Sequence, residues 1–196
     1  YHLDKRIARF RGNVKLYDLI NNLESDSLIY YRDLRKAEAA GRVKLRDTGS
    51  VMFADSLVHF QDAGDTYAFK NIVIKNFTNN TLITGNYLED FRKQARRFIT
   101  GEPLLVKIDT LEDGRYDTLF IEAKEMYATG DSADVIIAKD SVRIIRGDFS
   151  SFNSETTMIQ GEDRIFLYRK PEDSYPPVIW IEDSQLSGDS INIFLE

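Results

Sequence analysis

The residues best suited to chemistry in this 196-residue sequence are Asp-Ser pairs that precede an aliphatic residue. They occur in "LESDSLIYY" (23–31), "VMFADSLVHF" (51–60) and "LSGDSINIF" (186–194), and a further "GDS" lies at 130–132. Serine catalysis would need a base and an oxyanion hole beside the nucleophile. A catalytic signature is normally written once, whereas a structural unit recurs. The repetition therefore indicates a structural role, and we expect no enzyme activity.

Histidines and acidic residues offer no better candidate for catalysis or metal binding. His2 lies at the terminus, and His59 takes the place that Tyr30 and Ile193 occupy in the related stretches. The recurrent acids are Asp26, Asp55, Asp163 and Asp189. Calcium sites need denser acidic turns, so we interpret each of these acids as marking the start of a strand and accepting hydrogen bonds from a nearby turn. We expect no catalytic residue, no metal and no cofactor.

Composition narrows the class of protein further. With 42% hydrophobic and 12% aromatic residues the chain can form a substantial core. A net charge of −6 argues against nucleic acid as a partner. The basic stretch "RKQARRF" (92–98) could contact phosphates, although one basic turn on an acidic protein is more often simply solvated. There are no cysteines, so disulfides and thiolate chemistry are excluded.

Two alternating phrases repeat along the chain. The first phrase occurs as "GNVKLYD" (12–18) and "GRVKLRD" (41–47), with looser copies at 70–76, 138–145 and 177–183. The second phrase is Asp-x-Leu/Ile followed by an aromatic residue, at Asp26, Asp55, Asp163 and Asp189, with weaker forms at 86–91 and 117–122. Equal spacing of the copies, 29 residues from Gly12 to Gly41 and from Asp26 to Asp55, indicates one strand about every 15 residues.

Each phrase alternates apolar and polar residues, as half-buried strands do. The intervening segments carry turn residues. The one stretch that could pass for a helix, "LEDFRKQARRF" (88–98), falls in register with the repeat, so we predict strand, turn and strand there. The sequence predicts an all-β chain of a dozen or so short antiparallel strands. A sandwich, a roll and a solenoid all fit, and the two-strand repeat favours a roll that grows along one axis with unpaired strands at both ends.

The alternation of these phrases resembles the repeats of the OstA/LptA family, the periplasmic lipopolysaccharide-transport proteins. The resemblance is carried by "FRGNVKLYD", "LESDSLIYY", "AAGRVKLRD" and "VMFADSLVHF", and it extends over residues 8–122 and again over 138–195. It implies a twisted antiparallel β-jelly roll, an open, solenoid-like roll of repeated two-strand units. We expect residues 1–196 to form a single domain of this kind, as a mature or trimmed fragment of a longer protein.

The resemblance also implies a function. A protein of this family would hold the acyl chains of lipopolysaccharide or a related glycolipid in a hydrophobic groove and carry it across the periplasm. Its partners would be other periplasmic bridge proteins or further copies of itself, joined by edge-strand pairing. We expect a periplasmic location; "YHLDKRIARF" (1–10) has no apolar segment after its basic residues, so we expect a signal peptide to have been removed.

The candidate groove-lining residues are the inward aliphatic positions of the two phrases. They are Val14, Leu16, Leu28, Val43, Leu45, Leu57, Ile72, Ile74, Leu88, Leu119, Val142, Ile144, Ile165, Ile179, Ile181 and Ile191. An ordinary packed core would use the same side chains. Two other classes stay open: a β-solenoid scaffold with a filled interior, and a carbohydrate-binding β-sandwich in which Tyr30, Tyr31, Phe60 and Trp180 stack on sugars.

Overall fold

The protein is all-β. The computed structural model describes residues 6–17, 22–111, 113–130, 134–173 and 175–195. Its strands are β1 (Ile7–Tyr17), β2 (Asn22–Tyr31), β3 (Lys36–Arg46), β4 (Ser50–Phe60), β5 (Asp65–Asn76), β6 (Thr81–Phe91), β7 (Arg96–Thr100), β8 (Leu104–Thr110), β9 (Tyr116–Glu122), β10 (Glu125–Thr129), β11 (Val135–Arg146), β12 (Phe149–Ile159), β13 (Arg164–Tyr168), β14 (Val178–Ile181), β15 (Ser184–Ser187) and β16 (Ser190–Phe194). Two 3₁₀ turns, η1 (Arg92–Gln94) and η2 (Gln160–Glu162), join strands. No helix in the described ranges is long and apolar enough to cross a membrane.

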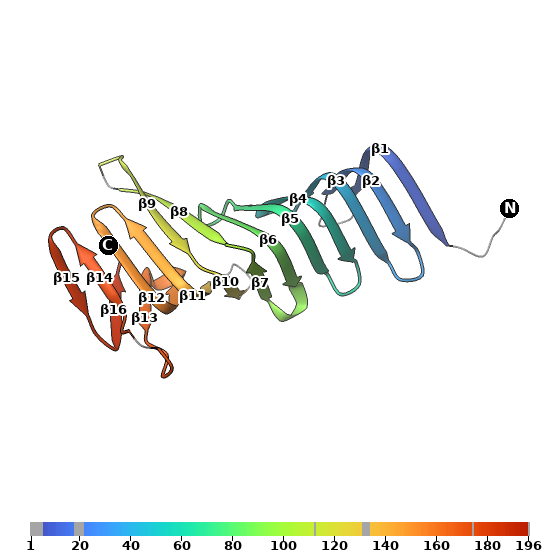
Figure 1. Ribbon diagram of the computed structural model, residues 1–196. Helices are drawn as coiled ribbons and strands as arrows, with labels where there is room; N and C mark the ends of the chain where they lie inside the picture. The colour runs from blue at the N-terminus through green and yellow to red at the C-terminus, as the bar shows by residue number, and fades with distance from the viewer. Residues whose placement is uncertain (1–5, 18–21, 112, 131–133, 174, 196) are drawn as a thin grey trace.

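In the part of the chain that the structure describes, all strand pairs are antiparallel, and each strand from β1 to β7 pairs with the next one in the chain (Figure 1). We call each line of strand that crosses the whole sheet a ribbon. Four ribbons are interrupted in the middle and consist of two strands each: β7 with β8, β9 with β10, β13 with β14, and β15 with β16. The sixteen strands therefore form twelve ribbons, where the sequence predicted a dozen or so strands. The ribbons are longer than predicted, since β1 to β6 each contain 10 to 12 residues. The strand, turn and strand predicted for residues 88–98 are also present, as β6, η1 and β7.

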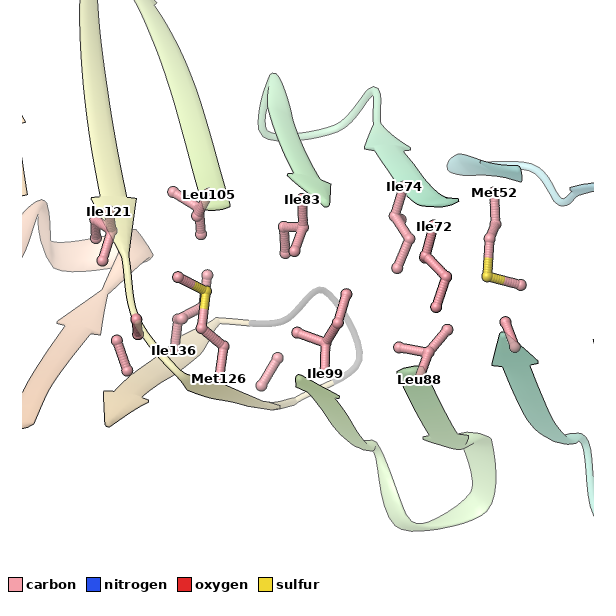
Figure 2. Close-up of a cluster of buried hydrophobic side chains, with 14 of the residues drawn as sticks. Met52, Ile72, Ile74, Ile83, Leu88, Ile99, Leu105, Ile121, Met126 and Ile136 are labelled. Carbon is pink, nitrogen blue, oxygen red and sulfur yellow. The ribbon is translucent and has the colours of Figure 1, made fainter. Parts of the chain in front are cut away.

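Each ribbon changes register in its middle, and this divides the molecule into two arms. Arm 1 contains residues 7–11, 27–31, 36–40, 56–60, 65–69, 87–91, 96–100, 125–129, 135–139, 155–159, 164–168 and 190–194. Arm 2 contains residues 14–17, 22–25, 43–46, 50–54, 72–76, 81–85, 104–110, 116–122, 142–146, 149–153, 178–181 and 184–187. Figure 2 shows aliphatic side chains of the two arms pointing toward one another, with Met52, Ile74 and Leu105 on one side and Leu88, Ile99 and Met126 on the other. The core lies between the arms.

The bend depends on residues that the repeat supplies at fixed spacing. In β3 it falls at Gly41 and Arg42, whose φ values are +79° and +46°. A Cβ on Gly41 would lie 2.6 Å from Asp26 Oδ2 of the neighbouring strand, so glycine is required there for both space and φ. Arg42 Nε donates to Asp26 Oδ1 at 3.0 Å. The acid thus holds the bulge in place from the adjacent ribbon.

The interpretation of the recurrent acids as strand starts is wrong for the first two of them. Asp26 and Asp55 lie in the middle of β2 and β4, because each of these strands runs on through the bend. Asp55 Oδ2 accepts a hydrogen bond from Asn71 Nδ2 at 2.9 Å, at the next bulge along. Asp163 and Asp189 do directly precede β13 and β16. Gly12 and Gly41, which open the first two copies of the first phrase, also lie at bends, with φ values of +81° and +79°.

Candidate functional site

The interior between the arms is lined by two apolar ladders that cross every ribbon. The arm 1 ladder consists, in register, of Phe10, Leu28, Ala39, Leu57, Ala68, Leu88, Ile99, Met126, Ala138, Thr156, Leu167 and Ile191. The arm 2 ladder consists of Leu16, Leu23, Leu45, Met52, Ile74, Ile83, Leu105, Ile121, Ile144, Ser151, Ile179 and Leu186. Only Thr156 and Ser151 interrupt them with a polar side chain. An apolar path therefore runs from the first ribbon to the last.

Fifteen of the sixteen predicted groove-lining residues are buried or partly buried in this interior. Nine belong to the ladders themselves: Leu16, Leu45, Ile74, Ile144, Ile179, Leu28, Leu57, Leu88 and Ile191. Val14, Val43, Ile72 and Val142 directly follow the bulges at the bend. Leu119 and Ile165 lie one position nearer the free edges of the arms, and both are at most 1% exposed. Ile181 shares its face with Ile179 but is 44% exposed, because it lies in the terminal hairpin formed by β14 and β15.

Sequence reasoning missed the first halves of the even strands, where Leu23, Met52 and Ile83 belong to the arm 2 ladder. Each lies five residues before the leucine that the second phrase marked. A strict two-residue alternation places such a residue on the outer face. The register shift at the bend turns this residue back to the interior. The recurring spacing of five residues between two aliphatic side chains was therefore the sequence signal for the bend.

Near the free edges of the arms the lining becomes polar over β4 to β8. On arm 1 one cross-strand row consists of His59, Thr66, Asp90 and Arg97. The facing row on arm 2 consists of Ser50, Asn76, Thr81 and Lys107. We call these the rim rows, and the opening between them the mouth. The interior is therefore amphipathic in cross-section, with apolar ladders at depth and polar groups at the mouth.

A cleft of about 380 Å³ occupies the mouth. Its arm 2 wall includes Asp47, Thr48, Ser50, Asn76 and Thr78. Its arm 1 wall includes His59, Thr66, Arg92, Arg96 and Arg97. His59 Nδ1 and Thr66 Oγ1 are 2.9 Å apart and both side chains are buried, so the histidine is part of the packed rim.

Toward the C-terminal end an ion pair crosses the mouth. Lys107 Nζ on β8 lies 2.9 Å from Asp163 Oδ1, in the turn before β13, and 3.2 Å from Asp109 Oδ1. Burial lowers the pKa of the Lys107 ammonium, but the hydrogen bonds to Asp163 and Asp109 outweigh burial and leave the pKa above its ordinary value. Lysine is thus held charged between the arms and ties them together.

Both ends of the roll expose strand edges and apolar side chains. Among the described residues, β1 pairs only with β2, β15 only with β14, and β16 only with β13. Phe10 of the arm 1 ladder is 48% exposed at the first ribbon, and Leu186 of the arm 2 ladder is 55% exposed at the last. Unpaired edges of this kind can accept a further strand.

The four aromatic residues considered for sugar stacking do not form one platform. Tyr30 and Tyr31 on β2 and Phe60 on β4 belong to arm 1, whereas Trp180 lies on β14 in arm 2. Tyr30 Oη donates to Gln61 Oε1 at 2.9 Å, and its ring packs against the core. Trp180 is 39% exposed and donates to Gln185 Oε1 at 3.0 Å.

The acids and serines that resembled chemistry have structural contacts. Asp189 of the "GDS" at 188–190 pairs with Arg169, Nη1 to Oδ1, at 3.1 Å; the other copy, at 130–132, lies largely outside the described residues. Among the residues that the structure describes, no group of three or more His, Cys, Asp or Glu could hold a metal ion.

Comparison with solved structures identifies the fold. The crystal structure of LptH from Pseudomonas aeruginosa, described as the LptA-homologous periplasmic component of the lipopolysaccharide transport device, superposes with a TM-score of 0.55. The alignment covers 75% of this chain and 95% of LptH, at 11% sequence identity. The chain has the LptA-like fold. The predicted antiparallel β-jelly roll of the OstA/LptA type is thereby confirmed.

Comparisons of sequence alone add nothing to this result. No protein-family model matches the chain, and no curated protein sequence matches it. At 11% identity the likeness to LptH concerns the arrangement of strands. The inward rows of side chains, and not a shared sequence, therefore provide the basis for a proposed function.

Proposed function

We propose that this protein is a non-enzymatic carrier of lipopolysaccharide or a related glycolipid in the periplasm. The observation that carries the proposal is the pair of apolar ladders, which run through all twelve ribbons beneath a polar mouth. Acyl chains would lie between the ladders, and the sugar head would remain at the mouth in water. Residues 1–196 would act as one unit, because one interior serves the whole chain.

Energetics favour this occupant. Each acyl CH₂ removed from water contributes about 0.8 kcal/mol, so a chain of a dozen carbons gains roughly 10 kcal/mol on leaving water. Without ligand the ladders pack against each other, and Leu57 and Ile72 are each 1% exposed. Entry of an acyl chain thus requires the arms to move apart, and the bend between them is where such movement would occur. LptH, described as a component of a lipopolysaccharide transport device, has the same fold.

Photo-crosslinking tests whether lipid enters. A photoreactive amino acid is placed at Leu57 or Ile72, which face inward, and at the adjacent outward positions Val58 and Val73 as matched controls. Incubation with lipopolysaccharide and irradiation should give lipid adducts at the inner positions and few at the outer ones. A folded protein that gives no adduct at Leu57 and Ile72 would contradict the carrier proposal.

We also propose that copies or partner proteins join end to end by strand addition. The outward side chains of β1 include Arg9, Arg11 and Lys15, whereas Glu182, Asp183 and Asp189 lie beside the opposite edge strands. Opposite charges at the two ends favour head-to-tail pairing over pairing of like ends. The exposed inward residues at both ends would then become part of a continuous interior.

Native mass spectrometry over a range of concentrations tests this assembly. The charge-reversed variant R9E/R11E should shift the distribution toward monomer, and K75E/K93E, which changes the charge equally away from the ends, should not. Equal distributions for all three proteins would exclude β1 as the pairing edge. The same spectra also report copurified lipid.

The packed state of the ladders favours one rival, a structural scaffold whose interior is permanently filled. Such a scaffold would assemble end to end but would take up no lipid. Oligomers without lipid in the mass spectrum, together with no adduct at Leu57, would establish it. Lipid adducts at that position would exclude it.

A further inference from the structure

One ribbon breaks the apolar character of the two ladders. In the second, fourth, sixth and eighth ribbons, two buried apolar side chains five residues apart face inward, one from each arm. These pairs are Leu23 with Leu28, Met52 with Leu57, Ile83 with Leu88, and Ile121 with Met126. In the tenth ribbon, β12, the same two positions are Ser151 and Thr156. Asn153 lies between them, and all three side chains are at most 4% exposed. The tenth ribbon thus places polar groups at a depth where every other ladder position is apolar.

Two of these three side chains satisfy one another. Asn153 Nδ2 donates to Thr156 Oγ1 at 2.9 Å and also donates to the backbone carbonyl of Glu155. Thr156 Oγ1 in turn donates to Asn153 Oδ1 at 3.2 Å. The donors of both side chains are therefore used within β12, at the bend.

The third side chain is different. Ser151 Oγ has no hydrogen-bond partner in the part of the chain that the structure describes. Beside it, in register, lie Ile144 of β11 and Ile179 of β14, which are both buried. A buried hydroxyl without a partner is costly, and one aimed into a binding groove is satisfied when the ligand supplies the partner.

The position of Ser151 restricts which part of a ligand can reach it. The serine belongs to the arm 2 ladder, and Phe149 lies two residues nearer the free edge of the same arm, packed against the core. A head group that remains in water at the mouth would have to pass Phe149. The partner of Ser151 must therefore be carried by the apolar part of the ligand. A hydroxyl group suits this place, because it both donates and accepts and adds little bulk.

We propose that Ser151 Oγ hydrogen-bonds a hydroxyl group carried on the acyl chain of the ligand, so that this serine selects hydroxylated over plain acyl chains. The inference rests on the proposed carrier function, because it is a chain between the ladders that reaches Ser151. The aliphatic ladder residues gain from burial of either kind of chain and do not distinguish them. Ser151 distinguishes them, because a plain chain leaves its hydroxyl unpaired.

Fatty acids that differ by one hydroxyl group test this selectivity. The probes are tetradecanoic acid and its 3-hydroxy, 7-hydroxy and 12-hydroxy derivatives, and affinity is measured by displacement of a fluorescent fatty acid from the purified protein. For each derivative, the affinity relative to the parent acid is compared between proteins. In Ser151→Ala this relative affinity should fall about tenfold for at least one derivative, while the affinity for the parent acid stays the same.

Ser25→Ala is the matched control. Ser25 is also buried in arm 2, but its hydroxyl already donates to the backbone carbonyl of Ser27 at 3.0 Å. Its removal should leave every relative affinity as in wild type. An equal change in Ser25→Ala and Ser151→Ala would overturn the site, because the effect would then not come from an unpaired hydroxyl.

Thermal stability without ligand provides a second readout. Because the Ser151 hydroxyl has no partner, Ser151→Ala should leave the Tm unchanged or raise it, whereas Ser25→Ala should lower it. Equal losses of Tm would show that the Ser151 hydroxyl is already bonded in the free protein, for example to a buried water, and would overturn the assignment.

The binding outcomes separate this site from the carrier proposal. If the fatty acids bind and Ser151→Ala changes no relative affinity, the hydroxyl site is overturned and the carrier function stands. If neither the fluorescent fatty acid nor any of the probes binds, both proposals fail.

Discussion

Lys107 and Asp163 join the two arms across the mouth, with Nζ and Oδ1 2.9 Å apart although 56 residues separate them in the chain. The lysine side chain is 10% exposed and the aspartate 54%, so the pair is half sheltered. To the N-terminal side of this pair lies the cleft of about 380 Å³. The ion pair is therefore a lateral limit on how far the mouth can open at β8.

Asp163→Asn should weaken the link between the two arms at the mouth. Because Asp163 is half exposed and Lys107 keeps Asp109, we expect a loss of only about 1 kcal/mol in the free energy of unfolding by urea. Asparagine tolerates the positive φ of 47° at this position, so the backbone should be unchanged. Hydrogen exchange should increase at the turn before β13. Asp189→Asn, at an acid that is 84% exposed, is the matched control and should change neither measurement. Equal effects of the two substitutions would contradict the closure.

The same ion pair predicts a dependence on alkaline pH. The pKa of Lys107 is raised in the folded protein, so its contribution to stability is complete below the unfolded pKa, about 10.4, and is lost as the pH rises through the folded value. The difference in Tm between wild type and Lys107→Met should thus be constant from pH 7 to 9 and shrink above pH 10. Comparison with the variant cancels the titration of other groups. A difference that grows with pH would refute the assignment.

Tyr87 provides a second pH prediction. Its hydroxyl donates to Glu89 Oε1 at 2.6 Å, and this hydrogen bond, together with burial and the charge of Glu89, raises its pKa to about 12. An unfolded tyrosine has a pKa of about 10. The neutral Tyr87 phenol therefore stabilises the folded state fully below pH 10, and this stabilisation is lost as the pH rises toward 12. In a phenolate absorbance titration, Tyr87→Phe should remove one group from the late phase. Removal of a group near pH 10 instead would contradict the hydrogen bond.

Adjacent isoleucines on β11 test the orientation of the ladders. Ile144 is fully buried and Ile145 is 51% exposed. Ile144→Ala should cost about 2–4 kcal/mol of unfolding free energy through lost burial and an internal cavity. Ile145→Ala should cost less than about 0.5 kcal/mol. Urea denaturation of both variants measures the difference, and similar costs would mean that the register at the bend is wrong.

Two glycines at the bends separate backbone strain from steric conflict. Gly12 and Gly41 have φ values of +81° and +79°, but a Cβ on Gly12 meets nothing within 4 Å. Gly12→Ala should therefore cost about 1 kcal/mol from conformation alone. Gly41→Ala should cost clearly more, because its Cβ overlaps Asp26. Adding Asp26→Ala to Gly41→Ala should recover part of the excess, and failure to do so would show that the acid does not define the bend.

Sequence periodicity could predict the class of fold because this roll is built by repetition. Residues such as Val43 and Leu45 alternate strictly, and the 29-residue spacing of Gly12 and Gly41 shows one bulge in each pair of ribbons. The repeated phrases did not reveal the bend in the middle of each ribbon. Two residues of positive φ in the middle of a strand shift its register, and an alternation of two cannot show that shift.

The polar mouth was less predictable. Thr66, Asp90 and Lys107 follow the same alternation as the buried aliphatic residues, yet they form the rim because they lie nearest the free edges of the arms. How deeply a side chain lies in the interior depends on its distance from the bend, and a local sequence pattern does not encode that distance. The pairing of Lys107 with Asp163 joins distant ribbons and has no sequence signal at all.

Nearest-neighbour stacking of the ribbons has a consequence for dimension. Neighbouring antiparallel strands are about 4.8 Å apart, so each two-ribbon repeat lengthens the interior by roughly 10 Å. Gain or loss of one repeat would alter the reach of the protein by that step while leaving every other bend, ladder and rim contact unchanged. The number of repeats therefore sets the length of the interior, and duplication or loss of one repeat changes that length in steps of roughly 10 Å.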